Sequence, residues 1–261
     1  MTQKVIAIVQ ARMNSSRLPG KSLLNLAGKT LIEHVAERVH SATTIDKVVF
    51  AIPDTEENRL LHHFLSQKLG ETVYLGSEKN VLERFAQVVE YESPTHVVRI
   101  TADDPLKDPA IIDYAVRLIV QDSELCYVTN SIDASFPEGI DVEAIKAETL
   151  IDAYKNATED YELEHVTPFI WSRPNLYKSL HFRSEKDLSN WRWTLDDFDD
   201  WIFLNSVLEK IDESTTTSEG TRFDYNTIVK LLEDDTSLLA LMPQNKRSVG
   251  KIISDRIKNA Q

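Results

Sequence analysis

The sequence is poor in cysteine and has no long apolar run, and both shortages exclude classes of protein. Its one cysteine, Cys126, leaves no partner for an intrachain disulfide, which favours a reducing compartment. Cys126 lies in the apolar run Leu125–Val128, and we expect it to be a buried strand residue. No run approaches membrane-spanning length, and no signal-peptide pattern precedes the first predicted strand. We therefore expect a soluble cytoplasmic protein without a membrane partner.

Positive charge is also scarce. The chain has 29 Lys and Arg against 42 Asp and Glu, a net charge of −13, which argues against a protein that coats nucleic acid. An acidic protein that binds an anionic ligand must gather its cations locally or use metal ions. No spacing of His and Cys suggests zinc, and His165 has no serine or cysteine nucleophile near it in the sequence.

One loop does gather cations. The β-branched run Val5–Val9 predicts a strand buried on both faces, as in a parallel sheet. The loop after it contains Arg12, Arg17 and Lys21, and no carboxylate follows until Glu33. Cations separated by small residues at the carboxyl end of such a strand can surround a polyphosphate. On composition alone a solvated turn explains the loop equally well, but the concentration of charge in an acidic protein favours a triphosphate site.

The same loop comes close to a P-loop without being one. The segment Ser15–Ser22 lacks the first glycine of the pattern G-x-x-x-x-G-K-S/T. A P-loop lysine begins a helix, whereas here the next helix is predicted only from Thr30. We reject the P-loop interpretation.

Strands and helices alternate through the first half of the chain, which is typical of a doubly wound parallel sheet. The predicted strands are Val5–Val9, Lys47–Ile52, Thr72–Leu75, His96–Ile100 and Leu125–Thr129, with helices over Thr30–Val39, Thr55–Leu69, Val81–Glu90 and Pro109–Val120. In the less regular second half we predict strands over Phe136–Ile145, Leu176–Phe182 and Trp191–Leu195, the last two antiparallel, helices over Glu148–Asn156, Leu163–Trp171, Trp201–Ile211 and Asn226–Leu232, and a mobile connector over Thr215–Gly220.

Paired aspartates follow two of the predicted strands. Asp103-Asp104 comes after the strand His96–Ile100, at the sheet edge where the basic loop also lies. A carboxylate that faces a triphosphate requires a bridging divalent cation, and Mg²⁺ binds such carboxylates together with phosphate oxygens. Asp196 begins a second acidic cluster. An ordinary turn would also explain the first pair, and a helix N-terminus would also explain the second cluster. The metal site and these structural roles therefore both stay open.

Aromatic and histidine residues give weaker signals. His165 is a candidate ligand or base, although isolated histidines are more often structural. The tryptophans favour core or dimer-interface positions over a sugar-stacking platform; they are Trp171, Trp191, Trp193 and Trp201.

Six segments together resemble a known family over most of the chain. They are Ile8–Lys21, Gly76-Ser77 with Val81–Phe85, Arg99–Pro105, Gly139–Glu143, Glu164–Thr167, and Arg192–Asp196 with Asp199 or Asp200. They resemble the cytidylyltransferases that activate sugars, such as the CMP-Kdo and CMP-acylneuraminate synthetases. The resemblance is strongest to the members of the spore-coat-polysaccharide-biosynthesis type.

This resemblance implies a Rossmann-like α/β fold with a small antiparallel dimerisation excursion. It implies one nucleotidyltransferase domain over 1–261, with a nucleotide-binding half over about 1–130 and an acceptor-binding, dimerisation and helical part over about 131–261. The implied reaction is Mg²⁺-dependent transfer of CMP from CTP to a sugar acid or phosphorylated small molecule, with release of pyrophosphate, in surface polysaccharide biosynthesis. A homodimer is also implied. The alternatives are another NTP with a sugar 1-phosphate, or an inactive nucleotide-binding scaffold that has lost a loop cation or a metal aspartate.

The resemblance also implies roles for single residues. Arg12, Arg17 and Lys21 would hold the triphosphate and act in catalysis, and Asp103 and Asp196 would hold Mg²⁺, with assistance from Asp199 or Asp200 left open. The implied nucleotide-binding set is Gln10, Ala11, Ser77, Arg84, Thr101 and Ala102, and the implied acceptor-binding set is Gly139, Asp141, Glu143, Glu164 and His165. Gln10 departs from the sialate and Kdo branches, which often carry proline there, and this leaves the acceptor open.

Overall fold

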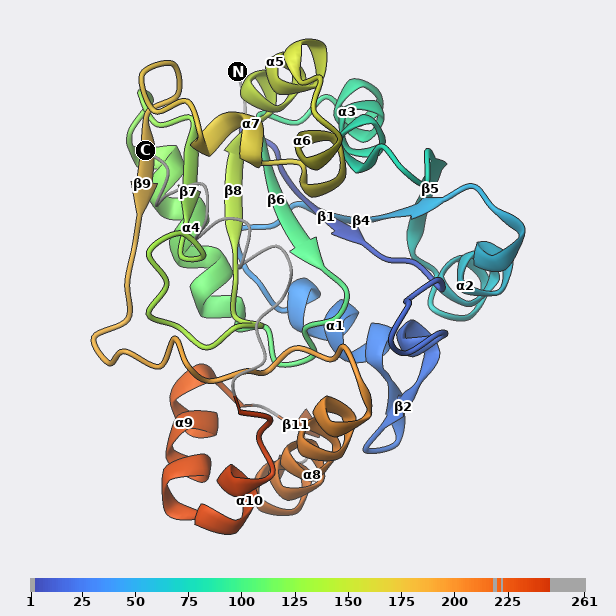
Figure 1. Cartoon of the computed structure of the whole chain (residues 1–261), viewed down its shortest axis with the longest axis vertical. Coiled ribbons are helices and arrows are strands. Elements are labelled where there is room, and N and C mark those ends of the chain that lie inside the picture. The colour runs from blue at the N-terminus through green and yellow to red at the C-terminus, as the bar shows by residue number, and fades with distance from the viewer. Residues whose placement is uncertain (1–2, 218–219, 222, 245–261) are drawn as a thin grey trace.

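A seven-stranded sheet runs through the computed structural model, which describes residues 3–217, 220–221 and 223–244 (Figure 1). The strands lie in the order β5-β4-β1-β6-β8-β7-β9. Their bounds are β1 Val5–Gln10, β4 Lys47–Pro53, β5 Thr72–Gly76, β6 His96–Thr101, β7 Tyr127–Thr129, β8 Glu143–Lys146 and β9 Ser179–His181. Among the described strands of this sheet, only β8 runs antiparallel to its neighbours. The predicted mostly parallel α/β sheet is confirmed.

Helices cover both faces of this sheet. They are α1 Leu31–His40, α2 Arg59–His63, α3 Val81–Glu92, α4 Pro109–Gln121, α5 Ala147–Asn156, α6 Asp160–His165, α7 Pro168–Trp171, α8 Phe198–Thr215, α9 Tyr225–Asp234 and α10 Thr236–Ala240. The local sequence determines where several helices begin. Thr30 and Glu33 form a capping box on α1, and Asn80 and Asp108 cap α3 and α4. In Figure 1 the helices α8, α9 and α10 lie together at the bottom of the view.

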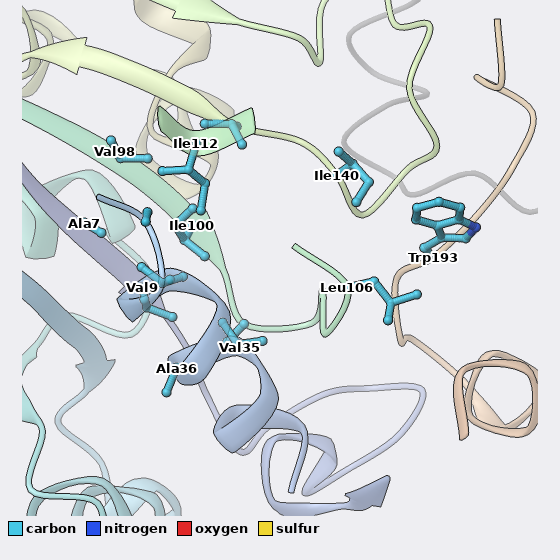
Figure 2. Packing of buried hydrophobic residues seen from close by; sticks show 14 of the residues in the cluster. Ala7, Val9, Val35, Ala36, Val98, Ile100, Leu106, Ile112, Ile140 and Trp193 are labelled. Atoms are coloured by element: carbon cyan, nitrogen blue, oxygen red, sulfur yellow. The ribbon is translucent and has the colours of Figure 1, made fainter. Parts of the chain in front are cut away.

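Side chains of β1 alternate between two cores, which explains why Val5–Val9 is apolar throughout. Ala7 and Val9 point into the core on one face of the sheet, while Ile6 and Ile8 point into the core on the other. The first core includes residues of α1, α4, α8 and α9, and the second includes residues of α3, α5 and α7. Figure 2 shows Val9 of β1 and Val35 of α1 among the side chains of the first core. A strand buried on both faces has no room for polar side chains.

Three predictions for the second half of the chain are wrong. Trp191–Leu195 forms no strand; it makes an isolated bridge through Arg192, because its backbone partners are the irregular segments at Glu138 and Asp103. The strand expected over Phe136–Ile145 is confined to β8. The segment Leu176–Phe182 contains β9, but β9 runs parallel to β7.

Two predicted helices are interrupted. The helix over Thr55–Leu69 consists of a 3-10 turn, α2 and a π-helical turn, and the helix over Leu163–Trp171 splits into α6 and α7 at Val166. Two small antiparallel pairs also form: β2 Asn25–Leu26 with β3 Lys29–Thr30, and β10 Thr216–Thr217 with β11 Gly220–Thr221. The latter pair falls on the predicted connector, of which residues 218–219 lie outside the described residues.

None of the helices within the described ranges is long and apolar enough to cross a membrane.

Candidate functional site

A cavity of about 910 Å³ lies at the carboxyl ends of β1 and β6. This is the edge of an open α/β sheet where ligands bind. Its walls come from the basic loop after β1, the end of β6, the segment before β8, and the α6–α7 region. The sequence-predicted residues that line it are Gln10, Ala11, Arg12, Arg17, Lys21, Arg84, Thr101, Ala102, Asp103, Asp141, Glu143, Glu164, His165 and Asp196.

The basic loop folds back on itself through local hydrogen bonds. The Gly20 N–H donates to the Met13 carbonyl at 2.9 Å, and Gly20 takes the left-handed conformation with φ 77° that glycine adopts without strain. The Ser22 hydroxyl donates to the Arg12 carbonyl at 2.9 Å. Buried Asn58 accepts from the Met13 N–H at 2.9 Å, a support that the sequence pattern did not indicate. These hydrogen bonds fix the backbone that carries the cations of the loop.

The loop cations meet the two acidic motifs. The Lys21 ammonium lies 2.9 Å from Asp196 Oδ1 and 3.3 Å from Asp103 Oδ2, and it donates to the Leu195 carbonyl at 2.7 Å. The Arg17 guanidinium lies 2.8 Å from Asp196 Oδ2. Motifs that lie far apart in the sequence thus form one charge cluster.

These contacts shift the ionisation of the cluster. Burial raises the pKa of Asp103, and the nearby charges of Asp104 and Asp196 raise it further against the opposing effect of Lys21. Burial also acts to raise the pKa of Asp196, but the charges and hydrogen bonds of Lys21, Arg192 and Arg17 outweigh it and lower the pKa to about 2. Burial acts to lower the pKa of Lys21, yet the two aspartates raise it. The ammonium and Asp196 are therefore both charged at neutral pH.

The carboxylates of Asp103 and Asp196 fit a metal cation that arrives with phosphate groups. Because one ammonium contacts both Asp103 and Asp196, one metal cation can contact both carboxylates. Across the described part of the chain, no group of three or more His, Cys, Asp or Glu residues forms a metal cage. Mg²⁺ suits such a site because it binds through one or two carboxylates plus substrate phosphates.

Asp104 has a structural role instead. Its Oδ2 lies 2.9 Å from the ammonium of the completely buried Lys107 and accepts from the Thr101 hydroxyl at 2.5 Å. The Lys107 ammonium also donates to the Asp141 carbonyl. This buried ion pair ties the end of β6 to the segment before β8. Lys107 carried no recognisable signal in the sequence.

Glu143 is held in a buried network. It pairs with Arg99, and its Oε1 accepts from the Tyr127 hydroxyl and, at 2.7 Å, from the Thr167 hydroxyl. Burial acts to raise its pKa, but Arg99 and these donors lower it, so it is ionised. Arg99 also donates from Nε to Gln10 Oε1 at 3.0 Å, which joins the end of β1 to this network. Arg99 lines the cavity and was missing from the predicted set.

A tight turn at Val166 sets the orientation of His165. Val166 has φ 71° and ψ −55°, a conformation that β-branched residues rarely adopt, and the Thr167 N–H donates to the His165 carbonyl at 2.8 Å. The turn buries Val166 while His165 and Thr167 both line the cavity. Burial and the charge of Arg99 lower the pKa of His165, so its ring is neutral at pH 7.

Two predicted site residues lie outside the cavity walls. The Ser77 carbonyl accepts from Arg84 Nη1, and its hydroxyl accepts from the Asn80 N–H at 3.1 Å, so Ser77 supports Arg84 and the start of α3. Gly139 has φ 107°, and a Cβ there would lie 2.7 Å from the Trp193 carbonyl carbon. Gly139 therefore permits a close approach of two backbones. Arg84 itself faces the cavity with a pKa lowered to about 10 by burial and by Arg12.

Comparison with known proteins places the chain in a family. The sequence model of the cytidylyltransferase family matches residues 6–231. The spore coat polysaccharide biosynthesis protein SpsF of Bacillus subtilis is 33% identical over 223 residues, which cover 82% of this chain and 90% of that protein. A 3-deoxy-manno-octulosonate cytidylyltransferase of Solibacter usitatus is 32% identical over 127 residues, 48% of each chain.

Solved structures agree. A cytidylyltransferase from Leptospira borgpetersenii superposes with a TM-score of 0.83 at 25% identity, covering 95% of this chain and 99% of that one. A CMP:2-keto-3-deoxy-manno-octonic acid synthetase complexed with CTP shares the fold, with a TM-score of 0.63 at 16% identity over 80% of this chain and 99% of that one. The resemblance inferred from the motifs is confirmed, and the chain belongs to the cytidylyltransferase family of nucleotidyltransferase enzymes.

Proposed function

We propose that this enzyme transfers CMP from CTP to a sugar acid or a phosphorylated small molecule, using Mg²⁺ and releasing pyrophosphate, in surface polysaccharide or glycoconjugate biosynthesis. The observation that carries the proposal is the contact of Arg17 and Lys21 with Asp103 and Asp196 at one cavity. The names of the relatives support the acceptor class: one acts in spore coat polysaccharide biosynthesis and another uses 3-deoxy-manno-octulosonate. A cytoplasmic homodimer is part of the same proposal.

The donor side of the mechanism is an exchange of ion partners. Arg12, Arg17 and Lys21 bind the triphosphate, and the last two leave their aspartate partners to do so. Asp103 and Asp196 would then hold Mg²⁺, which supplies positive charge beside the phosphate oxygens. Because phosphoryl chemistry depends on positioning and on charge stabilisation, the three cations act mainly on the charge that develops around the α-phosphorus.

The acceptor side supplies an oxygen nucleophile and a place for its proton. The acceptor oxygen attacks the α-phosphorus in line, a new P–O bond forms, and the bond to the bridging oxygen breaks with departure of pyrophosphate. Where the acceptor is a hydroxyl, His165 receives its proton, because the imidazole lines the cavity and its lowered pKa keeps it neutral. Asp141 and Glu164 line the same wall and contact the acceptor hydroxyl groups.

Pyrophosphate release by purified variants tests the proposal. Lys21→Ala should lower turnover by about 10²–10³-fold, the range measured when a donor to the transition-state charge is removed. Asp103→Asn should also lower turnover, because it removes a carboxylate that would hold Mg²⁺. Lys29→Ala is the matched control, because Lys29 pairs with Glu37 on the exposed surface. Circular dichroism establishes that each variant is folded. Turnover like that of the wild type in either site variant contradicts the proposal.

Two alternatives have their own outcomes. A donor other than CTP, with a sugar 1-phosphate as acceptor, gives pyrophosphate release that depends on that nucleotide. A nucleotide-binding scaffold binds CTP without turnover, but a scaffold is expected to have lost part of the charge cluster. Arg17, Lys21, Asp103 and Asp196 are all present and in contact, which favours the enzyme.

A further inference from the structure

Arg192 is a buried cation to which neither the comparisons nor the proposed mechanism gives a role. Its side chain is 2% exposed and lies among three carboxylates, those of Glu138, Asp196 and Asp200. A buried guanidinium is retained only when its donors are satisfied by well-placed acceptors. Here every part of the guanidinium has a carboxylate partner.

Arg192 contacts one carboxylate outside the cavity wall and two carboxylates that line it. Nε and Nη2 donate to the two oxygens of Asp200 at 3.0 and 3.2 Å, a two-pronged contact on the side of α8. Nη2 donates to Asp196 Oδ2 at 2.6 Å, and Nη1 donates to Glu138 Oε2 at 2.7 Å. Asp196 and Glu138 both line the cavity, whereas Asp200 does not. The guanidinium is therefore fixed from behind and holds two cavity carboxylates.

Asp200 also fixes the backbone of the same segment. Its Oδ2 accepts from the N–H groups of Asp196 and Asp197 at 2.9 and 3.1 Å. The side chain of Asp196 is thus oriented by Arg192 and its backbone by the carboxylate that holds Arg192. This arrangement leaves Asp196 little freedom to change its rotamer.

Arg192 differs from the other cations on Asp196 in its permanence. Arg17 lies on the loop with 47% of its side chain exposed, and Lys21 shares its ammonium between two aspartates. In the proposed mechanism both turn to phosphate when CTP binds. The Arg192 side chain does not turn to the phosphates, because it is buried and held by Asp200. It remains the counter-charge of Asp196 after the loop cations have left.

We propose that Arg192 is a positioning residue that holds Asp196 in the orientation for binding the divalent cation of the CTP complex and links it to Glu138 on the acceptor wall. This inference rests on the proposed function. Glu138 reaches the same guanidinium through Nη1, so an acceptor that displaces Glu138 alters the support of Asp196. Arg192 acts through Asp196 and is not itself a group that touches the reacting atoms.

The test is binding of Mn²⁺, as a Mg²⁺ probe, measured by electron paramagnetic resonance with a nonhydrolysable CTP analogue. Arg192→Lys keeps the charge but loses the two-pronged geometry, and Asp200→Asn loosens the anchor without touching the cavity. Both should weaken Mn²⁺ binding by about tenfold, as loss of a group that orients a metal ligand does elsewhere. Binding of the analogue without metal should change little. Arg173→Lys is the matched control, since Arg173 pairs with Glu162 away from the cavity.

The outcomes separate this inference from the proposed function. Wild-type Mn²⁺ affinity in folded Arg192→Lys and Asp200→Asn overturns the positioning role, even if their melting temperatures fall. If Arg192→Lys does not fold, Asp200→Asn alone decides. Failure of the wild-type protein to bind the analogue and Mn²⁺ together overturns the proposed function instead.

Discussion

Replacing Lys21 by methionine keeps the length of the side chain but removes the ammonium that joins two aspartates. Lys21 is 12% exposed and Asp196 is 8% exposed, so the pair lies largely out of solvent. Breaking a buried pair by removing one partner costs about 3–5 kcal/mol, because the remaining charge is left uncompensated. Arg17 and Arg192 still contact Asp196, so we place the loss at the lower end, about 3 kcal/mol. For a chain of this size that lowers the melting temperature by roughly 6–12 °C.

Added Mg²⁺ makes the prediction specific to the site. A divalent cation can replace the ammonium between Asp103 and Asp196, so Mg²⁺ should recover much of the lost stability in Lys21→Met. In the wild type the ammonium already occupies that position, and Mg²⁺ alone should change the melting temperature little. Differential scanning calorimetry with and without MgCl₂ measures both effects.

The control for this experiment is Lys29→Met. Lys29 and Glu37 are 49% and 56% exposed, so the loss should stay below about 1 kcal/mol and should not respond to Mg²⁺. Two results would refute the reasoning: a melting temperature of Lys21→Met equal to that of the wild type, or equal stabilisation of both proteins by Mg²⁺.

Acid titration gives the same experiment a second readout. The pKa of Asp196 is about 2 in the folded protein against the ordinary 3.8. Since the folded-state pKa is the lower one, the stabilisation is complete above about pH 4 and is lost as the pH falls toward about 2. Lys21→Met removes the largest charge that lowers this pKa, so its melting temperature should fall less steeply over that window.

Three further changes have defined outcomes. Gly139→Ala should lower the unfolding free energy by about 3 kcal/mol, because its Cβ meets the Trp193 backbone; a wild-type urea midpoint contradicts this. Val166→Gly should be more stable than Val166→Ala, the reverse of the ordinary order, because the positive φ strains only alanine; thermal melts compare them. In the wild type, kcat/KM for the acceptor should fall on the acid side of the pH profile, at a pH below the ordinary histidine pKa of 6.5, and His165→Gln should abolish this fall. If the variant retains the fall, a group other than His165 causes it.

Features that depend on neighbouring residues were predictable from the sequence. The run Val5–Val9 is buried on both faces as expected, and Thr30 caps its helix. The basic loop and Asp103 follow adjacent parallel strands. Because the carboxyl ends of parallel strands lie at the same edge of a sheet, the contact between Lys21 and Asp103 could be expected from the strand order alone. Asp196 lies in the same cluster although no strand precedes it. Its place at the site was implied by the resemblance to the cytidylyltransferases, whereas the strand predicted before it does not form.

Features that depend on distant contacts were not predictable. The antiparallel direction of β8 is set by pairing with both β6 and β7, which its four residues do not encode by themselves. Gly139 was expected at the acceptor, and its close approach to the backbone of Trp193 is a contact that no spacing along the chain indicates. Glu143 and Lys107 are polar residues buried by partners elsewhere in the sequence. A charged residue in a sequence does not indicate whether it faces a ligand or another side chain.

The most direct test of the account is pyrophosphate release by the wild-type enzyme with Mg²⁺, in which the four NTPs are crossed with a panel of sugar acids and sugar phosphates. The account predicts release with CTP and a restricted set of acceptors, and loss of that release in Lys21→Ala. Release that depends on a nucleotide other than CTP would contradict the proposed donor. Absence of CTP binding would contradict the account as a whole.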